Sequence, residues 1–302
     1  MRVLIYGATG YLGGAIVRRL VGEHDVVGFA RRADAADDLR TLGADAVVGD
    51  LDDISAAVAH VDAADAVIYA AQLLIQPEFD VVEAVIERMA GSGKTLVFTS
   101  GTGVLSERTD GDWSENTFAE DDEFVPSKYV GARKDTEDLV RAAAERGVRA
   151  MVVRPGMIWG HGGCPMIRGL FRSAEATGAV CYIGRGLNLY SNVHVDDVAE
   201  VYSLALDKGV AGALYHAVSG ETNYRTLAEA VAARLAVSTR SVDLGTALEF
   251  WDKFTALIAF SVCSRSRAPR TRRELGWMPS PDRLDILDDI DELVARRTTV
   301  RG

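Results

Sequence analysis

Short apolar runs alternate with amphipathic segments along the first half of the chain. The runs have the length and the Val- and Ile-rich composition of strands, and the segments between them repeat apolar residues at helical spacing. Strands are predicted at residues 2–7, 25–31, 45–50, 66–71, 95–100 and 150–156, and helices at 11–22, 34–42, 53–60, 78–90 and 127–146. Strands that are apolar almost throughout are typical of parallel sheets covered on both faces. With right-handed crossovers, this order predicts an α/β fold with a doubly wound parallel sheet.

The pattern is less regular after residue 160. A glycine-rich loop, WGHGGCP, follows the sixth predicted strand, and the segments beyond residue 222 are mostly amphipathic helices. We expect a Rossmann domain at residues 1–160, with strands that return to it from about 180–218. Residues 161–180 and 219–302 are predicted to form a small C-terminal substrate-binding lobe.

Three glycines lie at the turn between the first predicted strand and the first predicted helix, in LIYGATGYLG. In a dinucleotide-binding turn, Gly7 permits the tight bend, Gly10 lets the backbone approach a pyrophosphate, and Gly13 allows close packing of helix on strand. The helix N-terminus adds free N–H groups and partial positive charge. The turn therefore predicts a dinucleotide site with contacts from Gly7, Thr9, Gly10, Tyr11, Leu12 and Gly13.

The end of the second predicted strand indicates which dinucleotide binds. NAD-preferring sites present a carboxylate there to the ribose 2′-hydroxyl, but this chain has Ala30, followed by Arg31 and Arg32. Two guanidinium groups can bind a 2′-phosphate. We therefore predict NADP(H) as the cofactor of the Rossmann domain, the alternative being that both arginines are exposed surface. Further cofactor contacts are expected from Asp50, Leu51, Ala70 and Ala71.

Composition and charge narrow the kinds of partner. The chain carries 33 Lys and Arg against 44 Asp and Glu, a formal net charge of −11, which argues against binding to nucleic acid or to anionic membranes. The longest apolar-leaning stretch, residues 247–263, contains Glu249, Asp252 and Lys253 and so does not predict a membrane span. Three widely spaced cysteines predict neither a disulfide framework nor a metal site. We expect a cytoplasmic protein that binds a small-molecule substrate.

Motifs along the whole chain carry a family resemblance. They are GATGYLG at the first turn, DLDD after the third strand, FTSGTGVL at the fifth, YVGARKDTE on the next helix, VRPGMIWG after the sixth strand, and VHVDDVA at 193–199. On these motifs the chain resembles the short-chain dehydrogenase/reductase superfamily, in its extended and atypical branch of NAD-dependent epimerase/dehydratase-like proteins. The resemblance is weakest from about 240 to 270. It implies cofactor contacts from Pro155 and Gly156, and a homodimer.

The resemblance also implies a catalytic set, from which this sequence departs. Members of the superfamily typically use a tyrosine, a lysine four residues later, and a Ser or Thr near the end of the fifth strand. Tyr129 matches the tyrosine, but Arg133 occupies the lysine position. The usual hydroxyl position falls on Gly101, with Ser100 and Thr102 on either side as possible substitutes.

The arginine leaves three interpretations open. On a continuous helix Arg133 would share a face with Tyr129 and could lower the pKa of the phenol, although it could not relay a proton. Lys134 would lie about 140° away. In the first interpretation Tyr129 and Arg133 form a modified but active pair. In the second, the proton comes from other groups, such as Tyr190, His161, Thr102 or water. In the third, the site is redox-silent and senses NADP(H).

The remaining candidates surround the substrate. The expected substrate contacts are Gln72, His161, Tyr190 and Asn192. His194 is expected to be structural, with Asp196 and Asp197 capping the helix that follows. No three ligands are seen to converge, so no metal is expected. An apolar stripe at helical spacing over 248–260 is interpreted as core or dimer contact; if it lined the pocket, the substrate would have an apolar or aromatic part.

These features predict an NADPH-dependent reductase of a carbonyl or imine group in a small organic metabolite. One alternative is a redox-neutral epimerase, dehydratase or isomerase with bound NADP(H). The other is a non-catalytic NADP(H)-sensing protein. Sugar-nucleotide chemistry is less expected, because the short C-terminal lobe shows no clear set of residues for clamping a diphosphate.

Overall fold

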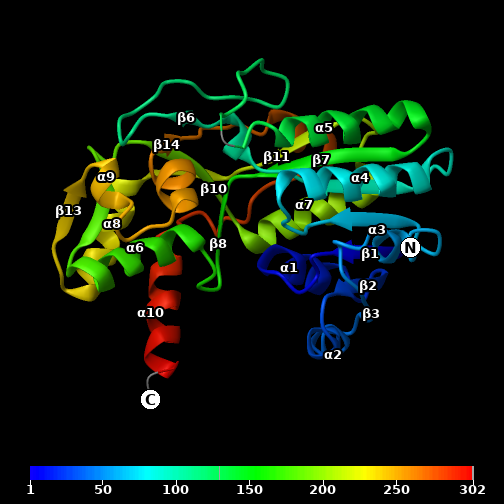
Figure 1. The fold of residues 1–302 in the computed structure, drawn as a ribbon, viewed down its shortest axis with the longest axis horizontal. Coiled ribbons are helices and arrows are strands. Elements are labelled where there is room, and N and C mark those ends of the chain that lie inside the picture. The colour runs from blue at the N-terminus through cyan, green and yellow to red at the C-terminus, as the bar shows by residue number, and fades with distance from the viewer. Residues whose placement is uncertain (129, 301–302) are drawn as a thin grey trace.

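Seven parallel strands form the central sheet of the computed structural model, which describes residues 1–128 and 130–300 (Figure 1). The order across the sheet is β11–β7–β5–β4–β1–β2–β3, and each neighbouring pair is parallel. The strands are β1 (Arg2–Tyr6), β2 (Asp25–Ala30), β3 (Asp45–Val48), β4 (Ala66–Tyr69), β5 (Thr95–Thr99), β7 (Arg149–Pro155) and β11 (Leu214–Ala217). The predicted doubly wound sheet is confirmed, because the chain runs outward from β1 in both directions.

Helices cover both faces of this sheet (Figure 1). One face carries α1 (Tyr11–Leu20), α2 (Ala33–Thr41) and α7 (Val195–Lys208), and the other carries α3 (Ile54–Val58), α4 (Ile75–Met89) and α5 (Arg133–Ala142). The buried strand residues accordingly divide between two cores. Ile5 and Val97 belong to the core that includes Val198 of α7, whereas Val67 belongs to the core that includes Val85 of α4. Burial on both faces explains why the strands are apolar almost throughout.

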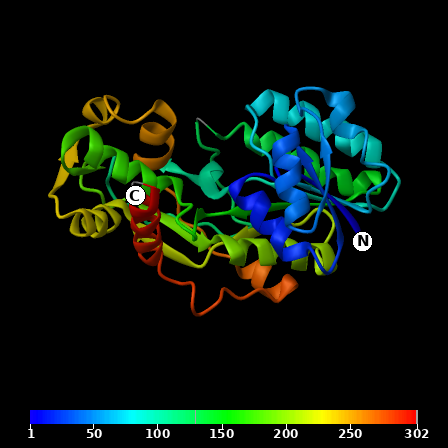
Figure 2. The ribbon, with the colours of Figure 1, turned by 90° about the horizontal axis from the view of Figure 1, so that it is seen from below.

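The C-terminal lobe has small sheets of its own, beside the central one (Figure 2). A three-stranded sheet contains β8 (Met157–Trp159), β10 (Leu189–His194) and β12 (Gly220–Asn223), and two strand pairs join β9 (Val180–Ile183) to β13 (Thr239–Val242) and β6 (Glu107–Arg108) to β14 (Val262–Cys263). Strands were expected to return to the Rossmann domain from about 180–218. Among the described residues, β11 does so, whereas β9 and β10 join the small sheets.

Helices give this lobe a packed core. They are α6 (Pro165–Thr177), α8 (Tyr224–Leu235), α9 (Leu244–Ala247) and α10 (Asp288–Val300), with a π-helical turn at Thr255–Phe260. A second π-helical turn, Thr271–Leu275, packs against α7 and β11 instead. Trp251 is buried, stacks on Phe260 with ring centroids 4.3 Å apart, and donates its indole N–H to the Gly169 carbonyl at 2.8 Å. Within the described ranges, no helix combines the length and the apolar character needed to cross a membrane.

One helix begins later than the sequence predicted. The predicted helix spans 127–146, but α5 begins at Arg133, and a 3-10 helix (Ala143–Arg146) completes it. Turns precede α5, with Gly131 N donating to Ser127 O at 2.6 Å. A Cβ at residue 131 would lie 2.3 Å from that oxygen, so the turn requires glycine. Tyr129 lies outside the described residues. Arg133 is the first residue of α5, and the shared helix face of Tyr129 and Arg133 stays a prediction.

Candidate active site

A cavity of about 570 Å³ opens at the carboxyl ends of the central strands. At this edge an open parallel sheet binds its ligands, beside the point where the strand order reverses. Most of the residues predicted to contact the cofactor line it: Gly7, Thr9, Gly10, Tyr11, Leu12, Gly13, Arg31, Leu51, Ala70, Ala71, Pro155 and Gly156. Phe29, Gly49 and Leu73 also line this cavity, and the sequence analysis did not single them out.

The turn between β1 and α1 has the shape of a diphosphate cradle. Gly7 has φ +76, and a Cβ there would lie 2.5 Å from the Ala70 carbonyl oxygen. At Gly13 a Cβ would lie 2.0 Å from the Gly7 carbonyl oxygen, so α1 packs too closely for any larger residue. Gly10 is the N-cap of α1 and offers no side chain to its first N–H groups. Those groups and the positive end of the helix therefore suit an anionic ligand.

The two arginines after β2 differ in their surroundings. Arg31 lines the cavity, whereas the Arg32 guanidinium is bound by Asp34, with Nε to Oδ1 at 2.9 Å and Nη2 to Oδ2 at 3.1 Å. Asp50 accepts the Asp52 N–H at 3.1 Å and is exposed; it is not among the described residues that line the cavity. Of these three predicted cofactor contacts, Arg31 lines the cavity, and Arg32 and Asp50 are not among its described lining residues.

Two of the residues that line this cavity carry buried hydroxyl groups. Ser100 and Thr102 both line it, on either side of Gly101, with Thr102 opening the 3-10 helix Thr102–Leu105. Ser100 Oγ and Thr102 Oγ1 are buried and have no hydrogen-bond partner in the part of the chain that the structure describes. Leaving a buried hydroxyl unsatisfied is costly, so both are suited to bind a cofactor or substrate group. Tyr190 lines the cavity nearby, and burial raises the pKa of its phenol.

Arg133 also lines the cavity, and a buried carboxylate holds it there. Its Nε and Nη2 donate to the two carboxylate oxygens of Glu78, at 2.8 and 2.5 Å. The Glu78 side chain is 1% exposed and that of Arg133 23% exposed. Burial raises the pKa of Glu78, and the hydrogen bonds from Arg133 oppose this shift. Lys134, by contrast, binds Asp138 at 2.6 Å.

Sequence reasoning missed Glu78, although a signal for it was present. The residue follows the same helical stripe as Val81, Val82, Val85 and Met89, all buried on the inner face of α4. A carboxylate at a core-facing position is rarely buried unless it is paired. The pattern therefore could have predicted a buried cation partner, but nothing in the local sequence of α4 names Arg133 as that partner.

A second cavity of about 850 Å³ adjoins the first and shares part of its lining, including Tyr11, Gln72, Arg133 and Tyr190. Its other walls are mostly apolar, from Leu73–Ile75, Val104, Met157, Met166, Phe254, Ile258 and Ala259. The apolar stripe over 248–260 therefore contributes to both the core and the cavity. Trp251 packs in the core as expected, whereas Phe254 and Ile258 line the cavity, which corrects the core interpretation for those two residues.

Two predicted substrate residues lie elsewhere. Asn192 is buried and accepts the indole N–H of Trp159 at 3.1 Å, while His161 is exposed and its Nε2 lies 3.0 Å from Asp196 Oδ2. Neither is among the described residues lining the two cavities. His161 consequently does not stand where a proton donor for a bound carbonyl would.

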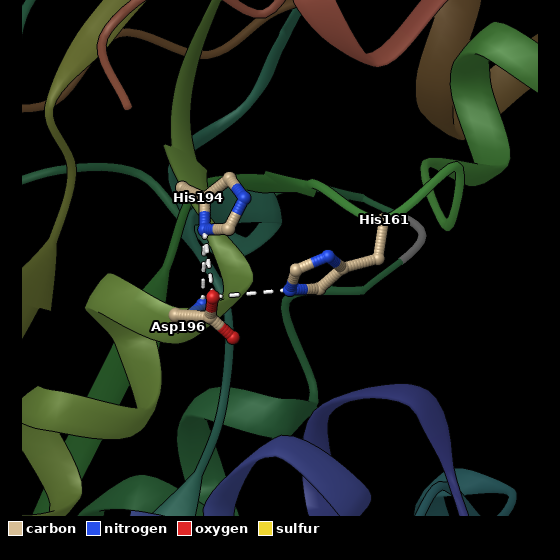
Figure 3. A group of neighbouring side chains, drawn as sticks. All are labelled: His161, His194 and Asp196. Carbon is tan, nitrogen blue, oxygen red and sulfur yellow. Dashed lines mark hydrogen bonds and ion pairs between the residues drawn. The ribbon is translucent and has the colours of Figure 1, made fainter. Parts of the chain in front are cut away.

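His161, His194 and Asp196 converge, which the sequence analysis did not foresee (Figure 3). One potential ligand atom from each lies within 4.8 Å of the others. However, His194 Nδ1 accepts the Asp196 backbone N–H at 3.2 Å, so His194 itself caps α7, a role assigned to Asp196 and Asp197 from the sequence. Arg283 Nη2 lies 3.5 Å from Asp196 Oδ2. A guanidinium and a helix N-terminus beside the cluster both disfavour a cation, and the expectation of no metal stays a prediction.

A buried aspartate fastens the glycine-rich loop. Asp289 of α10 accepts backbone N–H groups from Gly160 at 3.0 Å, Gly162 at 2.7 Å and Cys164 at 3.3 Å. On the other side, the Tyr11 hydroxyl donates to the Gly160 carbonyl at 2.6 Å. The loop therefore ties the start of α1 to α10, and it leads directly into the cavity-lining start of α6. Sequence reasoning missed Asp289, which lies more than a hundred residues away along the chain.

The chain matches a known protein family over most of its length. The model of the NAD dependent epimerase/dehydratase family matches residues 3–219. The chain belongs to this family. An uncharacterized protein of Schizosaccharomyces pombe is 31% identical, over 96% of this chain and 99% of its own length. The 4-hydroxy-2-methyl-3-oxo-4-farnesyl-3,4-dihydroquinoline-1-oxide ketoreductase of Stigmatella aurantiaca is 27% identical, over 73% of this chain and 69% of its own.

Solved structures of the NAD dependent epimerase/dehydratase family share the fold. The dTDP-glucose 4,6-dehydratase of Bacillus anthracis, solved in complex with NAD, superposes with a TM-score of 0.76 at 16% identity, over 99% of this chain and 98% of that chain. Proteins of the family bind NAD(P). The glycine cradle, the uncapped helix N-terminus and the orphaned hydroxyls described above fit such a dinucleotide. Distant relatives in the family are ketoreductases.

Proposed function

We propose that the protein is an NADPH-dependent reductase of a carbonyl or imine group in a small organic metabolite. The observation that carries this proposal is the junction of the two cavities. A dinucleotide-shaped cleft, which the buried hydroxyl residues Ser100 and Thr102 line, meets a mostly apolar cavity at Arg133 and Tyr190. Similarity to a ketoreductase over 73% of this chain supports the same reaction class.

The proposal includes NADP(H) rather than NAD(H). Ala30 ends β2 where an acidic side chain would otherwise bind a ribose hydroxyl, and Arg31 follows it into the cavity. A guanidinium there binds a 2′-phosphate with charge-assisted hydrogen bonds. The adjacent Arg32 contributes less, because Asp34 occupies its guanidinium.

In the proposed mechanism, bound NADPH supplies the hydride that reduces the carbon of the C=O or C=N group. The chain supplies binding, charge and a proton. Ser100 Oγ and Thr102 Oγ1 hydrogen-bond the substrate oxygen or nitrogen. Arg133, held by Glu78, places a permanent positive charge beside it and stabilises the negative charge that develops there. Tyr129, the residue that matches the tyrosine of the superfamily, donates the proton.

A direct assay tests this reaction. Purified protein is incubated with NADPH and a panel of ketones, aldehydes and imines, while absorbance at 340 nm and product masses are followed. Consumption of NADPH with products two mass units heavier than the substrates is expected. New products without net NADPH loss would instead indicate the redox-neutral alternative, and unchanged NADPH across the panel despite tight binding would indicate the sensing protein.

Two tyrosine variants separate the possible proton donors. Tyr129→Phe is expected to lower kcat by about 10²-fold or more, the usual contribution of a general acid, while NADPH binding stays unchanged. Tyr190→Phe is expected to affect KM more than kcat, because burial keeps that phenol protonated and a poor acid. The reverse ranking would assign proton delivery to Tyr190.

A further inference from the structure

The residues that line the larger cavity but not the nucleotide cleft are apolar, with the exception of Asp52. They come mainly from four separate parts of the chain: the start of α4 and the segment before it, the 3-10 helix that follows β5, the β8–α6 region, and the π-helical segment of the lobe. Leu74, Val104, Met157, Met166 and Ile258 represent them. Because the contributing elements belong to both the Rossmann domain and the C-terminal lobe, the apolar lining is a feature of the assembled fold and not of one hydrophobic helix.

Few charged residues line this cavity. Its charged residues, among those the structure describes, are Arg31, Asp52 and Arg133. Arg133 lies at the junction where the reacting group is placed, and Arg31 lies in the cleft that suits the adenosine end of the cofactor. No further Lys or Arg lines the described cavity, so a second diphosphate, such as that of a nucleotide sugar, would enter without a cation to pair with it.

Two apolar residues that line this cavity are exposed to solvent. Leu74 is 81% exposed and Phe254 is 50% exposed, yet both line the cavity, one from each lobe. Single exposed apolar residues are common, but exposed apolar residues that line the same cavity indicate a binding site where a ligand covers them. A substrate with an apolar body would bury both residues at once.

We propose that the substrate is an amphipathic molecule, with its C=O or C=N group at the polar junction and an extended alkyl or fused-ring body in the apolar cavity. A cavity of about 850 Å³ accommodates a drug-sized body. This inference rests on the proposed function only for the position of the reacting group. It names the substrate class and separates this chain from relatives whose names specify nucleotide sugars.

Equilibrium binding tests the inference without turnover. Protein saturated with NADP⁺, which cannot reduce a ketone, is titrated by calorimetry with 2-butanone, 2-hexanone, 2-octanone and 2-decanone, and separately with UDP-glucose. Affinity is expected to rise along the ketone series, by at most about fourfold per methylene group buried. Equal affinity for all four ketones, or binding of UDP-glucose in preference to 2-decanone, would overturn the inference.

A matched pair of variants locates the binding. Ile258→Glu places a charge in the apolar wall, at a residue that lines the larger cavity and not the nucleotide cleft. Leu248→Glu places one ten residues earlier, at a side chain that is 40% exposed and is not among the described cavity residues. Ile258→Glu is expected to weaken 2-decanone binding at least tenfold and leave NADP⁺ binding unchanged, and Leu248→Glu is expected to change neither. An equal effect of the two variants, with both proteins folded by circular dichroism, would contradict the proposed location.

Failure of this inference is distinguishable from failure of the proposed function. Graded ketone binding without NADPH consumption would keep the apolar substrate class and reject the reduction. NADPH consumption with small polar carbonyls, together with a flat ketone series, would keep the reduction and reject the apolar class.

Discussion

Arg133 occupies the position where members of the superfamily typically have a lysine, and its guanidinium group requires a different partner. A guanidinium binds a carboxylate through two parallel hydrogen bonds, which an ammonium cannot do. Glu78 provides that carboxylate from the buried face of α4. Burying its charge is unfavourable unless the charge is paired. The two residues therefore form one unit: Arg133 is positioned by Glu78, and Glu78 is tolerated because of Arg133.

The pair makes a prediction for stability. Arg133→Ala should lower the free energy of unfolding by about 3–5 kcal/mol, because it leaves the Glu78 charge buried without its partner. The double variant Glu78→Gln/Arg133→Ala should lose less, since no charge is then buried. Urea unfolding of the two proteins measures the difference. If the double variant proves less stable than Arg133→Ala alone, the pair is not coupled in this way.

The two arginines after β2 make a prediction for cofactor selectivity. Arg31→Ala should weaken NADPH binding by about 10- to 100-fold, the loss expected for a charge-assisted hydrogen bond, and should leave NADH binding nearly unchanged. Arg32→Ala serves as the control with the smaller effect, because Asp34 already occupies its guanidinium. Fluorescence titrations with both nucleotides provide the measurement. Equal losses for NADH and NADPH would remove the 2′-phosphate assignment.

At the scale of elements, the six predicted strands share the same error in their C-terminal ends. All six end one or two residues later than the observed strands. The extra residues include Gly7, Arg31, Ala70, Ser100 and Gly156, which line the nucleotide cleft. Three of them still bond to the neighbouring strand, because the backbone N–H groups of Ala70, Ser100 and Gly156 donate to the carbonyls of Tyr6, Val153 and Ala217. The strands end there nevertheless, because the chain leaves the sheet at its carboxyl edge to form the site.

The helix α1 offers a test of the glycine turn with an internal control. In Gly13→Ala the new Cβ would meet the Gly7 carbonyl oxygen at 2.0 Å, whereas in Gly14→Ala its nearest neighbour would be Arg18 Nη1 at 3.6 Å. Gly13→Ala should destabilise the protein by about 1–3 kcal/mol and weaken NADP(H) binding at least tenfold. Gly14→Ala should bind normally and be more stable by up to about 1 kcal/mol.

Unfolding by urea and nucleotide titration would read out both effects. Normal binding by Gly13→Ala would mean that α1 can move away from the turn without disturbing the site.

At the scale of the whole molecule, buried histidines link stability to pH. His216 is fully buried; its Nδ1 donates to the Arg267 carbonyl at 2.9 Å and its Nε2 lies 3.4 Å from Arg154 Nη1. Burial, with the nearby charge of Arg154, lowers the pKa of His216 from 6.5 to about 3. Burial likewise lowers the pKa of His194 to about 4. Both imidazoles are therefore neutral in the folded protein at pH values where they are charged in the unfolded chain.

The sign of the pH effect follows from this difference. Below about pH 6.5 the unfolded chain takes up protons that the folded protein does not, so stability falls as the pH drops towards 4. Each histidine contributes at most about 1.4 kcal/mol per pH unit. The free energy of unfolding of His216→Gln should therefore fall less steeply between pH 6.5 and 4.5 than that of the unchanged protein. Parallel slopes from urea unfolding at several pH values would contradict the assignment.

Two expectations about the whole molecule rest on the sequence and stay predictions: the homodimer and the cytoplasmic location. The structure adds the relation between the lobes. Asp289, at the start of α10, reaches across to the loop that Tyr11 contacts from the Rossmann domain. The C-terminal residues thus help to shape the boundary of the site, far from where the sequence motifs lie.

Patterns within the sequence were enough to predict the alternating strands and helices of the first half, the glycine turn and the family. These depend on periodicity and on residues close together in the chain, which a linear pattern records. The tertiary structure alone decided that Glu78 meets Arg133, that Asp289 fastens the glycine-rich loop, and that Phe254 faces a cavity while Trp251 faces the core. Such contacts join segments whose relative position is set by how whole elements pack. The amphipathic pattern of one element states which face is buried, but not what it is buried against.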